Sequence, residues 1–150
     1  MKKFSYRMEN ILNIKLQLEE QQKIAFALAN NALEEEKREL NRMAIRRRRY
    51  ERHLQEILTE SLDLEEIAYA RKGIDYMKQL MREQTFRIAS AEKKVDTERQ
   101  KLNEVRMERK TQEKLKQYAF DAYKKEYARE EAREIDQSVA YNYSTKEQTI

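Results

Sequence analysis

The stretch ILTESLDLEE, residues 57–66, interrupts a seven-residue apolar repeat that otherwise runs through most of the chain. Thr59, Ser61 and Asp63 can each accept backbone N–H bonds at the start of a helix. Glu66 follows Asp63 by three residues, as in a capping box. We therefore predict a hairpin tip at about residues 61–73, with its reversal near residues 61–63 and a kink at Gly73.

Before this break, apolar residues recur every seven positions and mark one narrow helical face. One series consists of Phe4, Ile11, Leu18, Ala25 and Ala32. The pattern then shifts by about one position into two parallel series: Phe26, Leu33, Leu40, Arg47 and Leu54, and Ala29, Glu36, Met43, Tyr50, Ile57 and Leu64. Such a shift arises when 3.6 residues per turn meet a seven-residue repeat. We predict a first helix over about residues 4–60.

After the break the same spacing returns, again in two series. They are Ile74, Met81, Ile88, Val95, Leu102, Arg109 and Lys116, and Met77, Gln84, Ala91, Glu98, Val105, Gln112 and Ala119. Apolar faces this narrow suit a two-stranded coil. We predict a second helix over about residues 74–138 and a disordered tail over about residues 141–150.

Two matched stripes around one break predict an all-α fold, a long antiparallel two-helix coiled-coil hairpin forming a single domain over residues 1–150. The second helix is the longer, so its end projects beyond the first residues of the chain. Its stripe weakens there, through several Ala to Ile135 and Val139. This overhang and the first turns of helix one are the predicted docking region for a partner.

Composition limits the alternatives. Charged residues make up 40% of the 150 residues, with one Gly, no Pro and no Cys, which disfavours any fold that needs many turns. Without Cys there are no disulfides or thiolate ligands, and His53 is the only His, so we predict no enzyme, no metal and no cofactor. No apolar run approaches the ~18 residues of a membrane span.

The segment Arg42–Arg52 leaves two interpretations open. Its arginines can bind the phosphates of a nucleic-acid backbone, so nucleic-acid binding is one alternative function. They can also form a solvated face balanced by Glu34, Glu35, Glu36 and Glu39, at spacings that allow pairing along a helix. Independently of this segment, a further alternative function is a generic scaffold that dimerises through the exposed apolar stripe.

Three segments resemble the FliJ family of the bacterial flagellum. They are FSYRMENILNIK (Phe4–Lys15) followed by Glu19 and Glu20, the pattern Tyr76-Met77-x-x-Leu80, and VRMERKTQEKLKQYAFDAYKKEYAREEAREIDQ (Val105–Gln137). The resemblance implies a soluble, cytoplasmic coiled coil of the type III export apparatus, associated peripherally with the inner face of the membrane. It further implies a stalk in the pore of the hexameric flagellar export ATPase, promoting its assembly and activity. Injectisome-type stalk proteins are close relatives and remain an alternative.

The same resemblance implies two sets of site residues. The positions matching the ATPase-binding end are Phe4, Arg7, Ile11, Leu12, Tyr127, Arg133, Ile135 and Asp136. Those matching the surface that contacts the cytoplasmic domain of the export-gate membrane protein are Met43, Tyr50, Tyr76 and Leu80. Arg46 and Arg87 stand where family members can have an aromatic residue or His. Export chaperones are further implied partners, whereas no nucleic acid or small-molecule ligand is expected.

Overall fold

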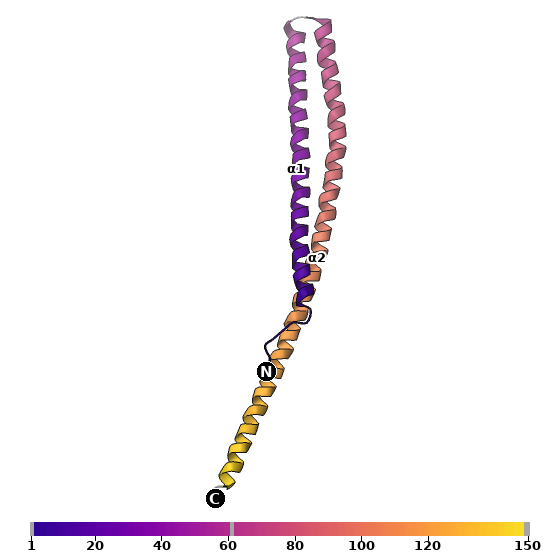
Figure 1. Ribbon diagram of the computed structural model, residues 1–150. Helices are drawn as coiled ribbons and strands as arrows, with labels where there is room; N and C mark the ends of the chain where they lie inside the picture. Colours follow the sequence, from indigo (N-terminus) through magenta and orange to yellow (C-terminus); the bar gives the residue numbers. More distant parts are fainter. Residues whose placement is uncertain (1, 61, 149–150) are drawn as a thin grey trace. The chain divides into compact units, whose positions relative to one another are not determined.

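The computed structural model describes residues 2–60 and 62–148, which form two helices, α1 (Glu9–Glu60) and α2 (Leu64–Gln148) (Figure 1). The predicted all-α helical hairpin is confirmed. The chain packs as two compact units, which we describe separately. The hairpin unit comprises Glu20–Asn103, and the terminal unit comprises Met1–Glu19 together with Glu104–Ile150.

The tip of the hairpin is shorter than expected. Asp63 caps α2, because its Oδ1 accepts the backbone N–H groups of Glu65 at 3.1 Å and Glu66 at 3.5 Å. The prediction of a break extending to residue 73 is wrong, since α2 is helical from Leu64 onward and Gly73 has no positive φ. Ala70 in this first part of α2 is fully buried, so the segment already packs within the hairpin unit. Ser61, which we placed in the turn, lies outside the described residues.

Gly73 serves close packing rather than a turn. A Cβ atom at this position would lie 2.6 Å from both Cδ1 and Cε1 of the Tyr50 ring. The ring of Tyr50 therefore lies against the backbone of α2, where no larger residue leaves room for it. This explains why the one glycine of the chain interrupts an otherwise strongly helical composition.

Within the hairpin unit the two helices run antiparallel and share a narrow seam (Figure 1). Its apolar core is formed by Ala29, Leu33 and Val95, with Phe26, Ile88 and Ala91 packed against them. Two polar pairs interrupt the core. Gln84, only 1% exposed, donates to the backbone O of Glu36 at 2.9 Å and also bonds its carboxylate. Gln22 donates in the same way to the backbone O of Glu98, at 3.2 Å, and to its carboxylate.

The seam of α2 confirms both predicted series, with Ile74, Met77, Gln84, Val95 and Leu102 all buried. The seam of α1 differs at its beginning.

We expected Ile11 and Leu18 on the seam, but both are exposed, whereas Leu12 and Glu19 are buried. The series of Leu33 therefore extends back to Leu12, and the predicted shift by one position is wrong. Glu19 interrupts the apolar pattern of this series. From the sequence alone, an acidic residue is expected on the surface unless a basic partner for it is known.

The terminal unit begins with a non-helical strap, residues 2–8, which lies over one face of α2. We expected helix one from about residue 4, but α1 begins at Glu9. The strap is attached to α2 by side chains instead of by helical packing. Tyr6 is buried and donates its hydroxyl to Oε1 of Gln112 at 3.1 Å, and Tyr123 donates its hydroxyl to the backbone O of Lys2 at 2.8 Å.

Beyond the strap, α2 continues alone within this unit (Figure 1). The expectation of disorder from residue 141 is wrong as far as Gln148, since the segment is helical. No Gly or Pro is present to end the helix, and Lys146 in the last turn is favourable to the helix dipole. Thr149 and Ile150, the remainder of the predicted tail, lie outside the described residues.

Candidate interaction surfaces

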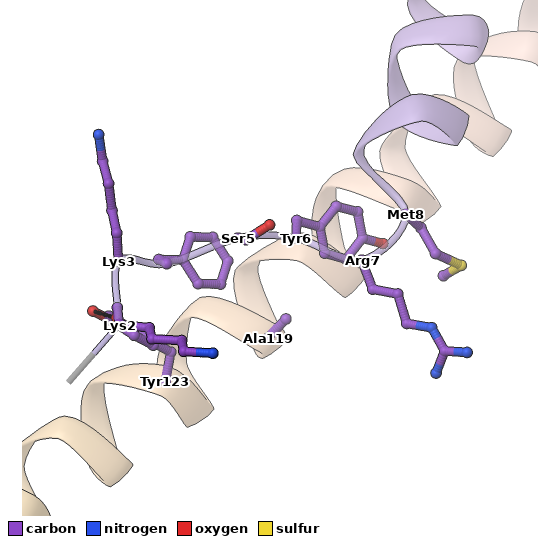
Figure 2. A pocket seen from close by; sticks show the side chains of 9 residues that line it. Lys2, Lys3, Ser5, Tyr6, Arg7, Met8, Ala119 and Tyr123 are labelled. Atoms are coloured by element: carbon purple, nitrogen blue, oxygen red, sulfur yellow. Dashed lines mark hydrogen bonds between the residues drawn. The ribbon is translucent and has the colours of Figure 1, made fainter.

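An open hollow of about 720 Å³ lies between the strap and α2 in the terminal unit. It is lined by all strap residues from Lys2 to Met8 together with Ala119 and Tyr123 (Figure 2). The side chains of Lys3 and Arg7 point away from α2, whereas Tyr6 turns toward it (Figure 2). The hollow is thus aromatic on its helix side and basic on its solvent side.

Aromatic rings hold the strap in place. Phe4 meets Phe120 edge-on at 5.0 Å between ring centroids and Tyr123 at 5.4 Å. Tyr127 extends the cluster, its ring 6.2 Å from that of Tyr123. The Nζ atom of Lys124 lies 4.9 Å from the centre of the Phe120 ring. Aromatic contacts of this kind each contribute roughly 0.5–1.5 kcal/mol beyond the area they bury, so several together can order a segment that lies outside the helix.

Ion pairs align α1 with α2 in the same unit. Lys15 pairs with Glu108 at 2.8 Å and Lys116 with Glu9 at 2.9 Å. The carboxylate of the buried Glu19 accepts a hydrogen bond from Nε of Arg109 at 2.6 Å. It also forms an ion pair with Arg106, whose Nε lies 3.5 Å away. The hydrogen bond to Glu19 raises the pKa of Arg109 above its ordinary value. Pairing on both sides is what allows a carboxylate to occupy a seam position.

All eight residues implied for ATPase binding lie in the terminal unit. Phe4 is half-buried in the aromatic cluster and Leu12 is buried on the seam, so these two support the structure locally. The exposed members are Ile11, Arg7, Tyr127, Arg133, Ile135 and Asp136. Every residue from Glu131 to Gln148 is exposed. The negative charge of Glu131 raises the pKa of the Tyr127 hydroxyl above its ordinary value.

A second hollow, the tip groove, lies in the hairpin unit and has a volume of about 440 Å³. Its lining residues are Arg46, Arg49, Tyr50, His53, Tyr76 and Met77. The four that come from α1 are spaced at i, i+3, i+4 and i+7, which places them on one helical face.

Of the residues implied for gate binding, Tyr50 and Tyr76 line the tip groove, whereas Met43 and Leu80 are half-buried elsewhere in the unit. Sequence reasoning did not assign Arg46, Arg49 and His53 to this site. Their helical spacing relative to Tyr50 was the signal that could have found them.

The balance of charge expected for Arg42–Arg52 is only partly present. Arg42 pairs with Glu35 and Glu39, both at 2.8 Å, and Arg47 pairs with Glu51 at 2.9 Å. Hydrogen bonds from Arg42 and Arg38 lower the pKa of Glu35. Within the part of the chain that the structure describes, Arg46 and Arg49 form no ion pair or hydrogen bond.

Across residues 2–60 and 62–148, no helix is long and apolar enough to cross a membrane. In the same residues, no cluster of three or more His, Cys, Asp or Glu side chains is arranged to hold a metal ion.

The protein is a helical hairpin. Its most prominent surface features are the hollow at the strap, the tip groove and the exposed end of α2. The sequence profile of the flagellar FliJ protein family matches residues 4–148. The chain belongs to this family, whose members are non-enzymatic components associated with the type III export apparatus.

The structure is similar to that of a putative YscO homolog from Chlamydia trachomatis. The TM-score is 0.76 at 19% sequence identity, and the match covers 99% of this chain and 100% of the other. At this identity the likeness concerns the fold alone. Among curated proteins, none matches the sequence significantly.

Proposed function

We propose that this chain is the central stalk of the hexameric flagellar export ATPase, entering the ring with its terminal unit and promoting ring assembly and hydrolysis. The observation that carries the proposal is the exposed end of α2, where every residue from Glu131 to Gln148 faces solvent. Ile135, Val139 and Tyr141 are each more than half exposed there. Exposed apolar residues on an unaccompanied helix favour a partner that surrounds it.

The strap suits such a role mechanically. Phe4, Tyr6 and Tyr123 tie the first residues of the chain to α2, so both segments can enter a ring together. The surface of the unit alternates in charge, with pairs such as Lys124–Asp121 at 3.6 Å and Arg129–Glu126 at 3.7 Å. Exposed pairs of this kind contribute roughly 0–1 kcal/mol each, so the fit inside a ring need not depend on one strong contact.

We further propose that the hairpin unit links the ATPase to the cytoplasmic domain of the export-gate membrane protein. Tyr50 and Tyr76 support this assignment, because they lie together in the tip groove. In this arrangement the protein is cytoplasmic, associates peripherally with the export apparatus and also assists export chaperones.

The ATPase assignment is tested by removing exposed side chains only. Ile11→Ala with Ile135→Ala changes residues that are 41% and 62% exposed, so folding should be preserved. We expect stimulation of the purified export ATPase to fall at least about fivefold, in line with the loss of two interface anchors. The readouts are the hydrolysis rate and the fraction of hexamer.

A matched control is available in the hairpin unit. Ile45 and Ile24 are 40% and 61% exposed, so Ile24→Ala with Ile45→Ala removes the same atoms from equally exposed positions. This variant should stimulate the ATPase as the unaltered protein does. Equal activity of the two double variants would contradict the stalk assignment of the terminal unit.

An injectisome-type stalk is the second candidate, favoured by the structural similarity to the putative YscO homolog over almost the whole of both chains. The two functions are separated by mixing the protein with the flagellar and the injectisome ATPases of its own cell. Stimulation of the flagellar enzyme alone supports the first candidate, and stimulation of the injectisome enzyme alone supports the second.

A further inference from the structure

Arg46 and Arg49 are two cations beside a groove that has no carboxylate in its lining. Their neighbours Arg42 and Arg47 are paired with glutamates of the same helix. Arg46 and Arg49, by contrast, have no ion pair within residues 2–60 and 62–148. A guanidinium group presents a fork of N–H donors that matches a carboxylate. The groove is therefore positively charged, and its two guanidinium groups are available to bind a carboxylate.

The same groove has an apolar wall held in a defined position. The Tyr50 ring rests on the backbone at Gly73, and Met77 is only 2% exposed. Tyr76 is 62% exposed, more than the half-buried Tyr50, so it is the tyrosine of the groove that is more accessible to a partner. A hollow of about 440 Å³ that is lined by both cationic and aromatic side chains is suited to an amphipathic ligand.

We propose that the tip groove binds an acidic peptide segment in which a carboxylate side chain is flanked by an aliphatic or aromatic one. The carboxylate pairs with Arg46 and Arg49, and the apolar side chain packs on Tyr76. The inference rests on the proposed function in one respect, since the cytoplasmic domain of the export-gate protein would supply this segment.

The surroundings favour a peptide over a nucleic acid. A nucleic-acid site needs a basic track that follows several phosphates and aromatic faces on which bases stack. Here the segment Arg42–Arg52 follows Glu35 and Glu39 and itself contains Glu51, so it is not a continuous basic track. One face of the Tyr50 ring is covered by α2 at Gly73, so it cannot receive a base.

The first test uses two fluorescein-labelled peptides and fluorescence anisotropy. One peptide has the core Asp-Glu-Leu-Phe-Glu-Asp, and the other has the uncharged core Asn-Gln-Leu-Phe-Gln-Asn. Arg46→Gln with Arg49→Gln should weaken binding of the acidic peptide by roughly tenfold or more, because charge-assisted pairs are lost. Arg48 and Arg52 are exposed and do not line the groove, so Arg48→Gln with Arg52→Gln is the matched control with the same change in charge.

The control variant should bind within about twofold of the unaltered protein, since it changes only the long-range field. Equal losses in the two variants, no binding of the acidic peptide, or equal binding of the uncharged peptide would each overturn the inference. It is also overturned if a single-stranded oligonucleotide binds more tightly than the peptide and loses affinity only in the Arg46/Arg49 variant. Circular dichroism confirms that both variants remain helical.

The second test uses the cytoplasmic domain of the gate protein as the probe. If the domain binds the unaltered protein and loses affinity for the Arg46/Arg49 variant alone, the result supports both the acidic-peptide site and the proposed link to the gate protein. If it binds both variants equally well, the inference is overturned while the link remains. If it binds none of them but the acidic peptide separates the variants, the link to the gate is wrong and the chemistry of the groove is upheld.

Discussion

Gly73 illustrates how a single side-chain contact can outweigh helix propensity. Inside a helix Gly is less favourable than Ala by roughly 1 kcal/mol, so propensity alone would favour Ala at this position. An added Cβ, however, would lie 2.6 Å from two carbons of the Tyr50 ring. The ring would have to move away from α2, and with it the wall of the tip groove.

We therefore predict that Gly73→Ala lowers the free energy of unfolding by about 1–3 kcal/mol, a typical cost of overpacking. Urea unfolding followed by far-UV circular dichroism measures the change. Lys72→Ala, at an exposed neighbouring position, should have little effect. In a Tyr50→Ala background the sign should reverse, because the clash is gone and the better helix former remains. Stabilisation by Gly73→Ala in the unaltered protein would show that the Tyr50 ring does not occupy this place.

At the scale of the element, the start of α2 depends on one side chain. Oδ1 of Asp63 accepts the N–H groups of Glu65 and Glu66, which have no partner within the helix. The backbone O of Asp63 also accepts the N–H of Ile67 at 3.0 Å. A cap at this position ends the reversal and sets where the returning helix begins.

Asp63→Ala is expected to cost about 1 kcal/mol of stability, as other lost N-caps do. Asp63→Asn keeps an acceptor oxygen and should cost only a few tenths of that amount. Hydrogen exchange shows where the cap acts. The amides of Glu65 and Glu66 should exchange faster in the Ala variant than in the Asn variant. Indistinguishable exchange in the two variants would mean that the cap does not hold the start of α2.

At the scale of the whole molecule, the question is what aligns two long helices whose apolar seams repeat every seven residues. A purely apolar seam could slide by one repeat with little loss of packing. In the hairpin unit, Gln22 bonds Glu98 and Gln84 bonds Glu36, each through both a carbonyl and a carboxylate. The two pairs are separated by the same interval on both helices, so they are satisfied together in a single alignment. Polar groups at seam positions commonly specify alignment at some cost in stability.

Replacing all four residues by Leu should therefore raise the urea midpoint while loosening the alignment. Because the chain has no Cys, spin labels can be placed at Asn30→Cys and Ser90→Cys without removing other thiols. The distance distribution between the labels should be single in the otherwise unaltered protein and broad in the Leu variant. The same replacements at the exposed Gln21, Gln79, Glu83 and Glu92 serve as the control. A distribution that stays single in the Leu variant would show that the polar pairs do not set the alignment.

Much of the fold could be predicted because its cause is local. A heptad spacing with almost no Gly or Pro leaves long helices as the main way to bury apolar side chains. The seam of α2 and the cap at Asp63 followed from this pattern. The two sets of implied site residues came from family resemblance instead, and the roles assigned to them stay predictions.

The sequence alone was sufficient for the helical composition, the single reversal and the seam of α2, since spacing and capping act between residues close in the chain. Packing between the helices selected Leu12 over Ile11 and buried Glu19. Ile11 and Leu12 are similarly apolar and lie about 100° apart around the helix, so only the facing helix distinguishes them. Glu19 can be buried because Arg106 and Arg109 meet it from α2. The tip groove likewise exists only where Tyr50 of one helix meets Gly73 of the other, a contact that no local pattern encodes.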